Sequence, residues 1–396
     1  MSRFHQSRVT GRPRRRERGS VLVIMLVTIL FTAFALVAFI EKAGNDLIVE
    51  QRYAETRRLR VEAYSALEVT LAVLNEFRQT DNGLHSPAEG WGDPLAFAGY
   101  TPTDGRTVDI AFEDESGKIS LPRADAPTLS RLFQSWQIAE TDADAMADAL
   151  LGWMQRNHTY TSTFEPDYDQ GDLPFVTPGR PMRSYGELAD VDKVRDVFYD
   201  TDGRPTDFWY RFVDSVSLLN FPRPNINGAK PAALLALGQF ELTQQQALSD
   251  YLAGTGSYQS QGPGLPFQSP AEAQTVTGPG GNIAAFATTI SALRIRVTVH
   301  DGTSEFHLAA VVAPPNGATV VQTTATATRA ETSASAAGSA AQQQPAQATA
   351  SQRSPTASAR SPQTPAQRAL NYPFTLLEIR ENDDIPPPPP PPPPSA

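Results

Sequence analysis

Four acidic side chains within eight residues are the part of this chain best suited to chemistry. They are Glu165, Asp167, Asp169 and Asp172, in a segment whose proline and glycine content predicts a loop. Carboxylate oxygens in a flexible loop are the ligands that Ca²⁺ prefers. The pattern is not an EF-hand, because Gly171 falls at the fifth position instead of the sixth and the closing glutamate is missing. Two interpretations remain open, a calcium site and a solvated charged loop.

No other group of residues forms a catalytic pattern. The chain has no cysteine, which excludes thiol nucleophiles, thiolate metal sites and disulfide bonds together. None of the histidines falls in H-E-x-x-H or another metal spacing, and the chain contains neither a G-x-S-x-G turn nor a phosphate-binding loop. The histidines are His5, His85, His158, His300 and His307. We therefore expect a protein that is not an enzyme, with calcium as the single cofactor that its sequence suggests.

Charge is distributed unevenly along the 396 residues. Residues 1–19 hold seven arginines and one glutamate, a net charge of +6, whereas the rest of the chain has a net charge of −16, which together give −10. Binding to nucleic acid depends on lysine and arginine side chains that neutralise phosphates. An acidic body of this kind therefore excludes nucleic acid as a partner.

The elements that position these residues begin with an apolar run. No charged residue occurs from Ser20 to Ile40, directly after a leader with five arginines between Arg12 and Arg18. A helix of about 20 apolar residues crosses the hydrocarbon core of a bilayer, and arginines before it hold the N-terminus in the cytoplasm. The alternative is a cleavable secretory signal, with Ala33-Phe34-Ala35 as its cleavage site.

The residues after the apolar run favour a helix that continues. Between Glu41 and Phe77 there is no proline, and Gly44 is the only glycine. Apolar residues then recur at spacings of three and four, which is typical of one face of a helix. They are Tyr64, Leu67, Leu71, Leu74 and Phe77. An unbroken helix from Ser20 to Phe77 would be about 87 Å long, which a signal peptide does not need.

The remaining chain predicts an α+β fold in which helices interrupt a sheet. Alternating residues indicate strands at Thr107–Phe112, Leu293–Val299, Glu305–Val312 and Tyr372–Ile379, with Gly117–Leu121 as a hairpin partner of the first. The helical candidates are Pro127–Trp136, Asp142–Trp153, Tyr185–Val191, Asp207–Leu219 and Lys230–Leu237. Thr141 and Asp142 are expected to begin the second of these helices.

We expect the following organisation along the chain. A leader (1–19) precedes a membrane-spanning half-helix (20–40) and an amphipathic half-helix (41–77), and the head comprises 78–121, 285–314 and 371–381. A helical domain (122–253) and a linker (254–284) are inserted in the head, a disordered Ala/Ser/Thr/Gln/Pro-rich segment (315–370) precedes its last strand, and a proline-rich tail (382–396) follows.

Several short phrases resemble one known family, GspK, the large minor pseudopilin of type II secretion systems. The phrases are Asp114–Leu121, Leu150–Trp153, Arg180–Leu188 and Asn225–Leu235, followed by the hairpin Leu293–Val312 and the strand Tyr372–Ile379. With the arginine leader and the uncharged helix, the resemblance covers about residues 12–314 and 371–381. Each phrase is short, but their shared order is fairly specific.

The resemblance implies a function in assembly. A prepilin peptidase of the inner membrane would cut after Gly19 and methylate the amine of Ser20. The protein would have a pseudopilin, or type IV pilin-like, fold with a large inserted helical domain. It would stand at the tip of the pseudopilus with GspI-like and GspJ-like minor pseudopilins, start or cap the filament, and contact secreted cargo, with its head in the periplasm.

Two details refine this resemblance. Most pilin-like proteins carry glutamate at the fifth mature position, where it pairs with the amine of the subunit ahead, whereas this chain has Ile24. A carboxylate within the membrane is costly unless it is paired, so an apolar residue is expected in a subunit with no other subunit ahead of it.

The family also has calcium-binding aspartates around the tryptophan of Leu150–Trp153. In this chain those positions are Gly152, Gln155 and Asn157. Glu165, Asp167 and Tyr168 match the later part of that motif.

Two alternatives belong to other classes. One is an exported hydrolase or binding protein that is anchored by an ordinary signal sequence, which predicts cleavage near Ala35 or none. The other is a minor pilin of a type IV pilus, which the size of the helical insertion and Ile24 argue against. The sequence therefore favours a pseudopilin, a filament subunit of the inner membrane.

Overall fold

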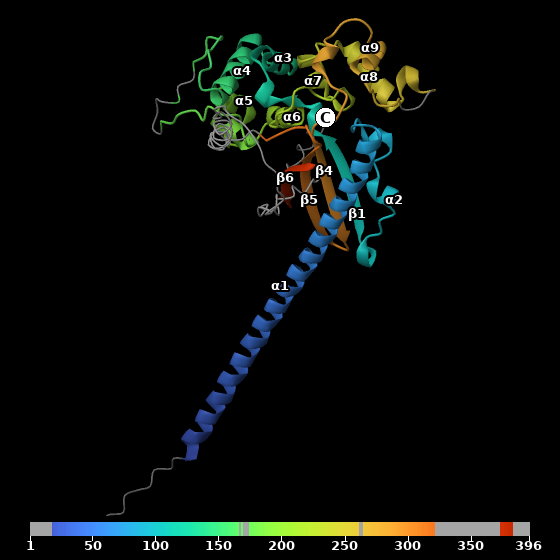
Figure 1. Cartoon of the computed structure of the whole chain (residues 1–396). Helices are drawn as coiled ribbons and strands as arrows, with labels where there is room; N and C mark the ends of the chain where they lie inside the picture. Colours follow the sequence, from blue (N-terminus) through green and yellow to red (C-terminus); the bar gives the residue numbers. More distant parts are fainter. Residues whose placement is uncertain (1–17, 166–167, 169–173, 261–263, 321–372, 383–396) are drawn as a thin grey trace, which may run out of the picture. The chain divides into compact units, whose positions relative to one another are not determined.

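The computed structural model describes residues 18–165, 168, 174–260, 264–320 and 373–382. The chain divides into two compact units, Met1–Val61 and Glu62–Ala396. The described part of the first unit is the start of α1 (Arg18–Thr80), a helix of 63 residues that Figure 1 shows as one unbroken ribbon. The prediction of an uninterrupted helix is therefore confirmed, and the helix extends to Thr80.

The first turns of α1 expose apolar side chains throughout. Every large apolar side chain from Val21 to Ile40 is exposed. The hydroxyl groups of Thr28 and Thr32 donate to the carbonyls of Ile24 and Ile29, at 2.8 and 2.9 Å. Polar groups in this run are thus satisfied within the helix, as an apolar medium requires. Among the described residues, α1 is the one helix that is long and apolar enough to cross a membrane.

The second unit contains an antiparallel sheet in the order β1-β4-β5-β6 (Figure 1). Its strands are β1 (Thr107–Asp114), β4 (Leu293–Asp301), β5 (Ser304–Ala313) and β6 (Thr375–Glu381). On β4 the buried residues Ile295 and Val297 alternate with the half-buried Arg296. The alternation expected from the sequence therefore buries one face of the sheet.

The C-terminal part of α1 belongs to this unit. Its buried stripe comprises Ala63, Ala66, Leu67, Thr70, Val73 and Leu74. The predicted stripe is displaced by part of a turn, because Tyr64, Leu71 and Phe77 lie at its margin and are half-buried. The hydroxyl group of Tyr64 donates to Oε1 of Glu381 at 2.7 Å, which joins α1 to β6.

Most helices of the second unit lie between β1 and β4 in the chain. The α-helices are α2 (Pro94–Ala98), α3 (Ala126–Ser135), α4 (Glu140–Met154), α5 (Val194–Phe198), α6 (Asp207–Ser215), α7 (Pro231–Ala236), α8 (Leu242–Ala253) and α9 (Pro270–Thr277). The 3-10 helices are η1 (Pro87–Glu89), η2 (Thr103–Gly105), η3 (Glu115–Gly117), η4 (Leu121–Arg123), η5 (Tyr185–Asp190), η6 (Ile226–Gly228), η7 (Gly256–Tyr258) and η8 (Ile283–Ala285). The α+β class, with a long N-terminal helix, an antiparallel sheet and a helical insertion, is confirmed.

The inserted helices bury a core of their own. Phe133, Phe198 and Phe212 are fully buried, and their ring centroids lie 5.3–6.4 Å apart. Aromatic side chains supply a large apolar area for each residue that is ordered. Helices α3 to α7 therefore pack together around this core.

Three local predictions were wrong. The helix predicted over Asp207–Leu219 ends at Ser215, because Val216 and Ser217 form a strand. Gly117–Leu121 does not pair with β1, because Asp114 turns the chain into η3 by accepting a hydrogen bond from the Ser116 N–H at 2.8 Å. Instead β2 (Ile119–Ser120) pairs in parallel with β3 (Val216–Ser217), and β1 pairs with β4. Helix α4 begins at Glu140 without a side-chain cap, not at Thr141-Asp142.

The region expected to be a linker, 254–284, is in part folded. It contains α9, and Phe267 and Ala273 are buried with Phe240, Leu248 and Phe286 in a second small core. Helix α8, which the sequence did not predict, packs against α9. The glycine and proline content that indicated a linker marks helix ends instead, such as Gly254 at the C-terminus of α8 with φ of 64°.

The low-complexity segment also begins within the fold. Ala318 is buried, and Asn220 and Thr319 exchange two backbone hydrogen bonds of 2.9 and 3.0 Å. The disorder predicted for 315–370 therefore does not extend to residues 315–320. The rest of that segment from residue 321, and the proline tail from residue 383, lie outside the described residues.

Candidate functional site

The residues of the predicted cleavage site lie at the beginning of α1. Gly19 and Ser20 are in its first turn, and Ile24, one turn later, is 64% exposed. The position that would be fifth after the predicted cleavage thus carries an apolar side chain within an exposed apolar surface. Cleavage after Gly19 and methylation of Ser20 remain predictions.

The predicted calcium site lies largely outside the described residues. Glu165 is described and exposed, whereas Asp167, Asp169 and Asp172 are not described. No group of three or more metal-binding side chains occurs in the described part of the chain. One carboxylate is too few for Ca²⁺, which takes about six to eight oxygen ligands. Calcium binding by this segment therefore remains a prediction.

A buried carboxylate that the sequence analysis missed lies beside this segment. Asp148 in α4 accepts hydrogen bonds from the backbone N–H groups of Thr161 and Ser162, at 2.8 and 2.5 Å, and lies 2.9 Å from Nε2 of His158. Burial alone would raise the pKa of Asp148, but these hydrogen bonds outweigh it and lower the pKa. We call Asp148 and residues 158–162 the Asp148 clasp; its hydrogen bonds hold the loop after α4.

A signal for the clasp was present in the sequence. Asp148 stands in an apolar stretch of α4, where a carboxylate is costly unless hydrogen bonds satisfy it. Gly152 follows one turn later, and a Cβ atom there would lie 2.2 Å from the Tyr160 hydroxyl oxygen. Asp148 and Gly152 therefore form the surface of α4 on which the loop packs.

The phrases that carried the family resemblance meet in two pairs. In the first, Nε1 of Trp153 donates to Glu187 at 3.3 Å, and Arg180 also contacts Glu187 at 3.2 Å. In the second, the fully buried Asn225 donates through Nδ2 to Asp114 at 2.7 Å. Each phrase therefore serves to fix another phrase that is distant in the chain.

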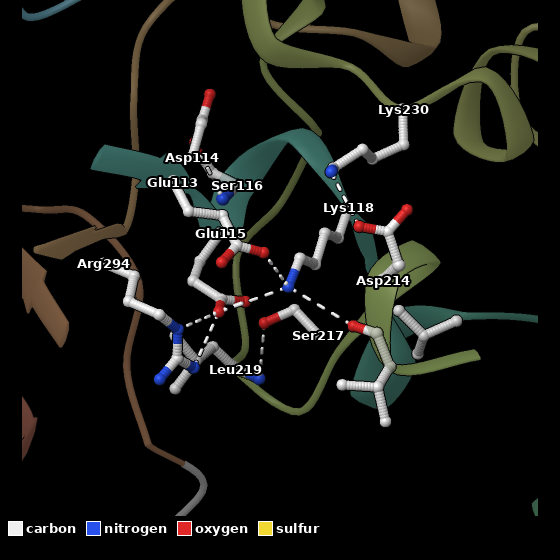
Figure 2. A network of polar contacts seen from close by, with 12 residues as sticks. Glu113, Asp114, Glu115, Ser116, Lys118, Asp214, Ser217, Leu219, Lys230 and Arg294 are labelled. Atoms are coloured by element: carbon white, nitrogen blue, oxygen red, sulfur yellow. Dashed lines mark hydrogen bonds and ion pairs between the residues drawn. The ribbon is translucent and has the colours of Figure 1, made fainter. Parts of the chain in front are cut away.

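A network of buried and half-buried charges lies where the inserted helices join the sheet (Figure 2). We name it the Lys118 network; it comprises Glu113, Glu115, Lys118, Arg294, Arg296 and Glu378. Three carboxylates face three cations in this network, and Arg380 also contacts Glu378. Buried ions require such pairing, because each unpaired charge would lose its hydration without compensation.

Lys118 and Glu115 are the centre of this network. Nζ of Lys118 lies 2.7 Å from Glu113 and 3.3 Å from Glu115, and donates to the carbonyl oxygen of Val213 in α6 at 3.3 Å. Arg294 of β4 donates to Glu115 at 2.7 Å, as Figure 2 shows. The network therefore joins β1, α6 and β4, and fixes the inserted helices to the sheet.

The charges of the Lys118 network change the proton affinities of its members. Burial would raise the pKa of Glu113, but Lys118 and Arg296 lower it to about 2. Burial would likewise lower the pKa of Arg294, but Glu115 raises it above its usual value. Both groups are therefore held in their charged forms. The arrangement is that of a structural joint, since its ion pairs and hydrogen bonds connect β1, α6 and β4.

Comparison with solved structures finds several chains that resemble this one. No protein-family model matches this chain, and no curated protein matches it. The chain is similar to a chain in the crystal structure of the GspK-GspI-GspJ complex of the type 2 secretion system from enterotoxigenic Escherichia coli. The identity is 11%, the similarity covers 69% of this chain and 97% of that chain, and the TM-score is 0.46. A likeness of this degree does not by itself assign a function.

Proposed function

We propose that this chain is a minor pseudopilin of the GspK type, a non-enzymatic subunit of a type II secretion pseudopilus. One observation carries the proposal. An uncharged helix starts directly after an arginine-rich leader and continues unbroken into a unit whose antiparallel sheet is interrupted by helices. An exported enzyme with an ordinary signal sequence has no need of this continuity.

The leader would be removed by a prepilin peptidase of the inner membrane. The peptidase would cut after Gly19 and methylate the new amine of Ser20. The run from Ser20 to Ile40 would anchor the protein in the inner membrane until it is extracted into the filament, with the head in the periplasm. Its exposed apolar side chains would then pack among the helices of neighbouring subunits.

Its place in the filament would be the tip. Ile24 offers no carboxylate to the amine of a subunit ahead, and the inserted helices broaden the head. Partners there would be GspI-like and GspJ-like minor pseudopilins. The chain would start or cap the pseudopilus during protein export across the outer membrane, and it would contact secreted cargo.

Mass spectrometry of the mature N-terminus tests this proposal. The chain, expressed in a host with a type II secretion system, should begin at an N-methylated Ser20. A Gly19→Leu variant should keep its leader, because the residue before the cut would no longer fit the peptidase. A wild-type chain that starts at Leu36, or that retains its leader, would contradict the proposal.

A further inference from the structure

The last strand of the sheet joins the fold through a long connection. A two-residue turn joins β4 to β5, whereas 61 residues (314–374) separate Ala313 at the end of β5 from Thr375 at the start of β6. Thr375 nevertheless pairs directly with Ala313, so the chain returns to the point that it left. The entropic cost of closing a connection rises with its length. β6 is therefore held in place less firmly by its connection than a strand in a short hairpin.

Specific contacts hold β6 at both ends. Phe374, just before the strand, is 4% exposed, and Leu377 packs against a small buried cluster that includes Val311. At the other end, the Asn382 N–H donates to the carbonyl of His307, and the His307 N–H donates to Oδ1 of Asn382, both at 2.9 Å. The edge of β5 thus offers apolar contacts near one end, backbone groups that pair with β6, and hydrogen bonds to Asn382 at the other end.

Two further contacts come from elements that are set without β6. Arg294 lies 3.9 Å from Glu378. Glu115 contacts the same guanidinium group at 2.7 Å (Figure 2). Tyr64 of α1 donates to Glu381 at 2.7 Å. Both partners of β6 are therefore in place before the strand docks, as in a preformed peptide site.

The outer side of β6 contributes little burial. Leu376 is 52% exposed and Ile379 is 38% exposed. Within the described residues no further strand pairs with β6, so it is the edge of the sheet. Few apolar contacts would have to be broken for the strand to leave.

We propose that β6 docks as a separable segment, and that the edge of β5 is a binding site for an extended peptide. Its occupant is the chain's own segment 373–382. Phe374 and Leu377 are the apolar anchors of this segment, and Glu378 and Glu381 are its charged contacts. The role in secretion does not require this property, and the inference stands without it.

The test uses the full chain in detergent, with a specific protease site inserted between residues 321 and 372 and cut after folding. The probe is a fluorescent peptide of residues 371–384. We expect the peptide to replace the cut strand and bind the remaining chain, while circular dichroism of the helices stays unchanged. The uncut chain should bind far less peptide, because its tethered strand competes at a high effective concentration.

Two peptide variants provide matched controls. Phe374→Ala removes the buried anchor and should weaken binding at least tenfold, whereas Leu376→Ala alters an exposed side chain and should bind like the parent peptide. The proposal is overturned if the peptide binds only after the chain is unfolded, if the chain unfolds when the connection is cut, or if both variants bind equally.

Discussion

The carboxyl group of Glu113 is removed from most of the solvent, yet the cations of Lys118 and Arg296 keep it ionised. Its pKa of about 2, against an ordinary value of 4.5, means that the folded chain binds this proton less readily than the unfolded chain. The stability that follows is present above about pH 4.5 and is lost as the pH falls toward 2. The shift corresponds to an upper bound of ~3 kcal/mol.

A Glu113→Gln variant tests this dependence. Its free energy of unfolding should lie below that of the wild type at pH 7, and the difference should shrink toward zero as the pH approaches about 2. Chemical denaturation at a series of pH values measures the difference. Two curves that stay parallel over this range would show that Lys118 and Arg296 do not stabilise the ionised form.

Gly117 marks a place where two backbones touch. A Cβ atom there would lie 2.0 Å from the carbonyl oxygen of Gly228, and the Lys230 N–H donates to the carbonyl of Gly117 at 3.1 Å. We expect Gly117→Ala to lower the free energy of unfolding by on the order of 3 kcal/mol, because neither backbone can move aside easily.

The matched control for this substitution is Gly44→Ala. Nothing lies within 4 Å of a Cβ atom at Gly44, which stands inside α1. Alanine there should leave stability unchanged or raise it by up to about 1 kcal/mol through helix propensity. Thermal melting of both variants provides the comparison, and equal melting temperatures would contradict the close approach at Gly117.

At the scale of elements, the Asp148 clasp decides whether the loop after α4 is held. Asp148→Asn keeps the size of the side chain but removes the charge that Thr161, Ser162 and His158 share. We expect a local loss of about 1–3 kcal/mol. Amide hydrogen exchange at Thr161 and Ser162 should then become at least fivefold faster, while the core of α3 and α4 remains protected.

Asp142→Asn is the control, because Asp142 is exposed in the first turn of the same helix. The clasp should also weaken in acid. Since the pKa of Asp148 is lowered in the fold, its contribution is present above its ordinary value of 3.8 and is lost as the pH falls further. Unchanged exchange rates in Asp148→Asn would show that other contacts hold the loop.

Elements with a regular pattern were predictable from the sequence, and contacts between distant segments were not. The spacing of apolar residues located α1, and the alternation of side chains located β4 and β5. Nothing local indicated that Asn225 would reach Asp114, 111 residues away. Helices α8 and α9 were missed because a few buried aromatic side chains, such as Phe240 and Phe267, stabilise them in a segment of weak composition.

The same division holds for the candidate sites. The leader and Ile24 were found from residue types in sequence order, which needs no folding. The Asp148 clasp and the Lys118 network are made by side chains from several elements, and their partners are chosen by the fold. The charged phrase Asp114–Lys118 indicated a turn. The Lys118 network could not be predicted from it, because the network depends on where the fold places Arg294 and Glu378.

At the scale of the whole molecule, a substitution at Ile24 tests the proposed position of the chain in the filament. Ile24 would be the fifth residue after the proposed cleavage, where it offers no carboxylate. In the proposed tip position, Ile24→Glu would place a charge in the proposed membrane-spanning run with no amine ahead to pair with it. We expect recovery of the variant with GspI-like and GspJ-like partners to fall at least tenfold, measured by co-purification. Ile24→Leu should assemble normally, and normal assembly of the glutamate variant would contradict a tip position.

The long stretch of sequence between β1 and β4 also determines the order in which parts of the head fold. The 178 residues from 115 to 292 must emerge before the strand that pairs with β1 becomes available. When the chain is made from its N-terminus, the inserted helices can form their core while β1 still lacks its neighbour. We expect the helical block to be the first part of the head to resist proteolysis in nascent chains, and the sheet to close only when the last strand arrives.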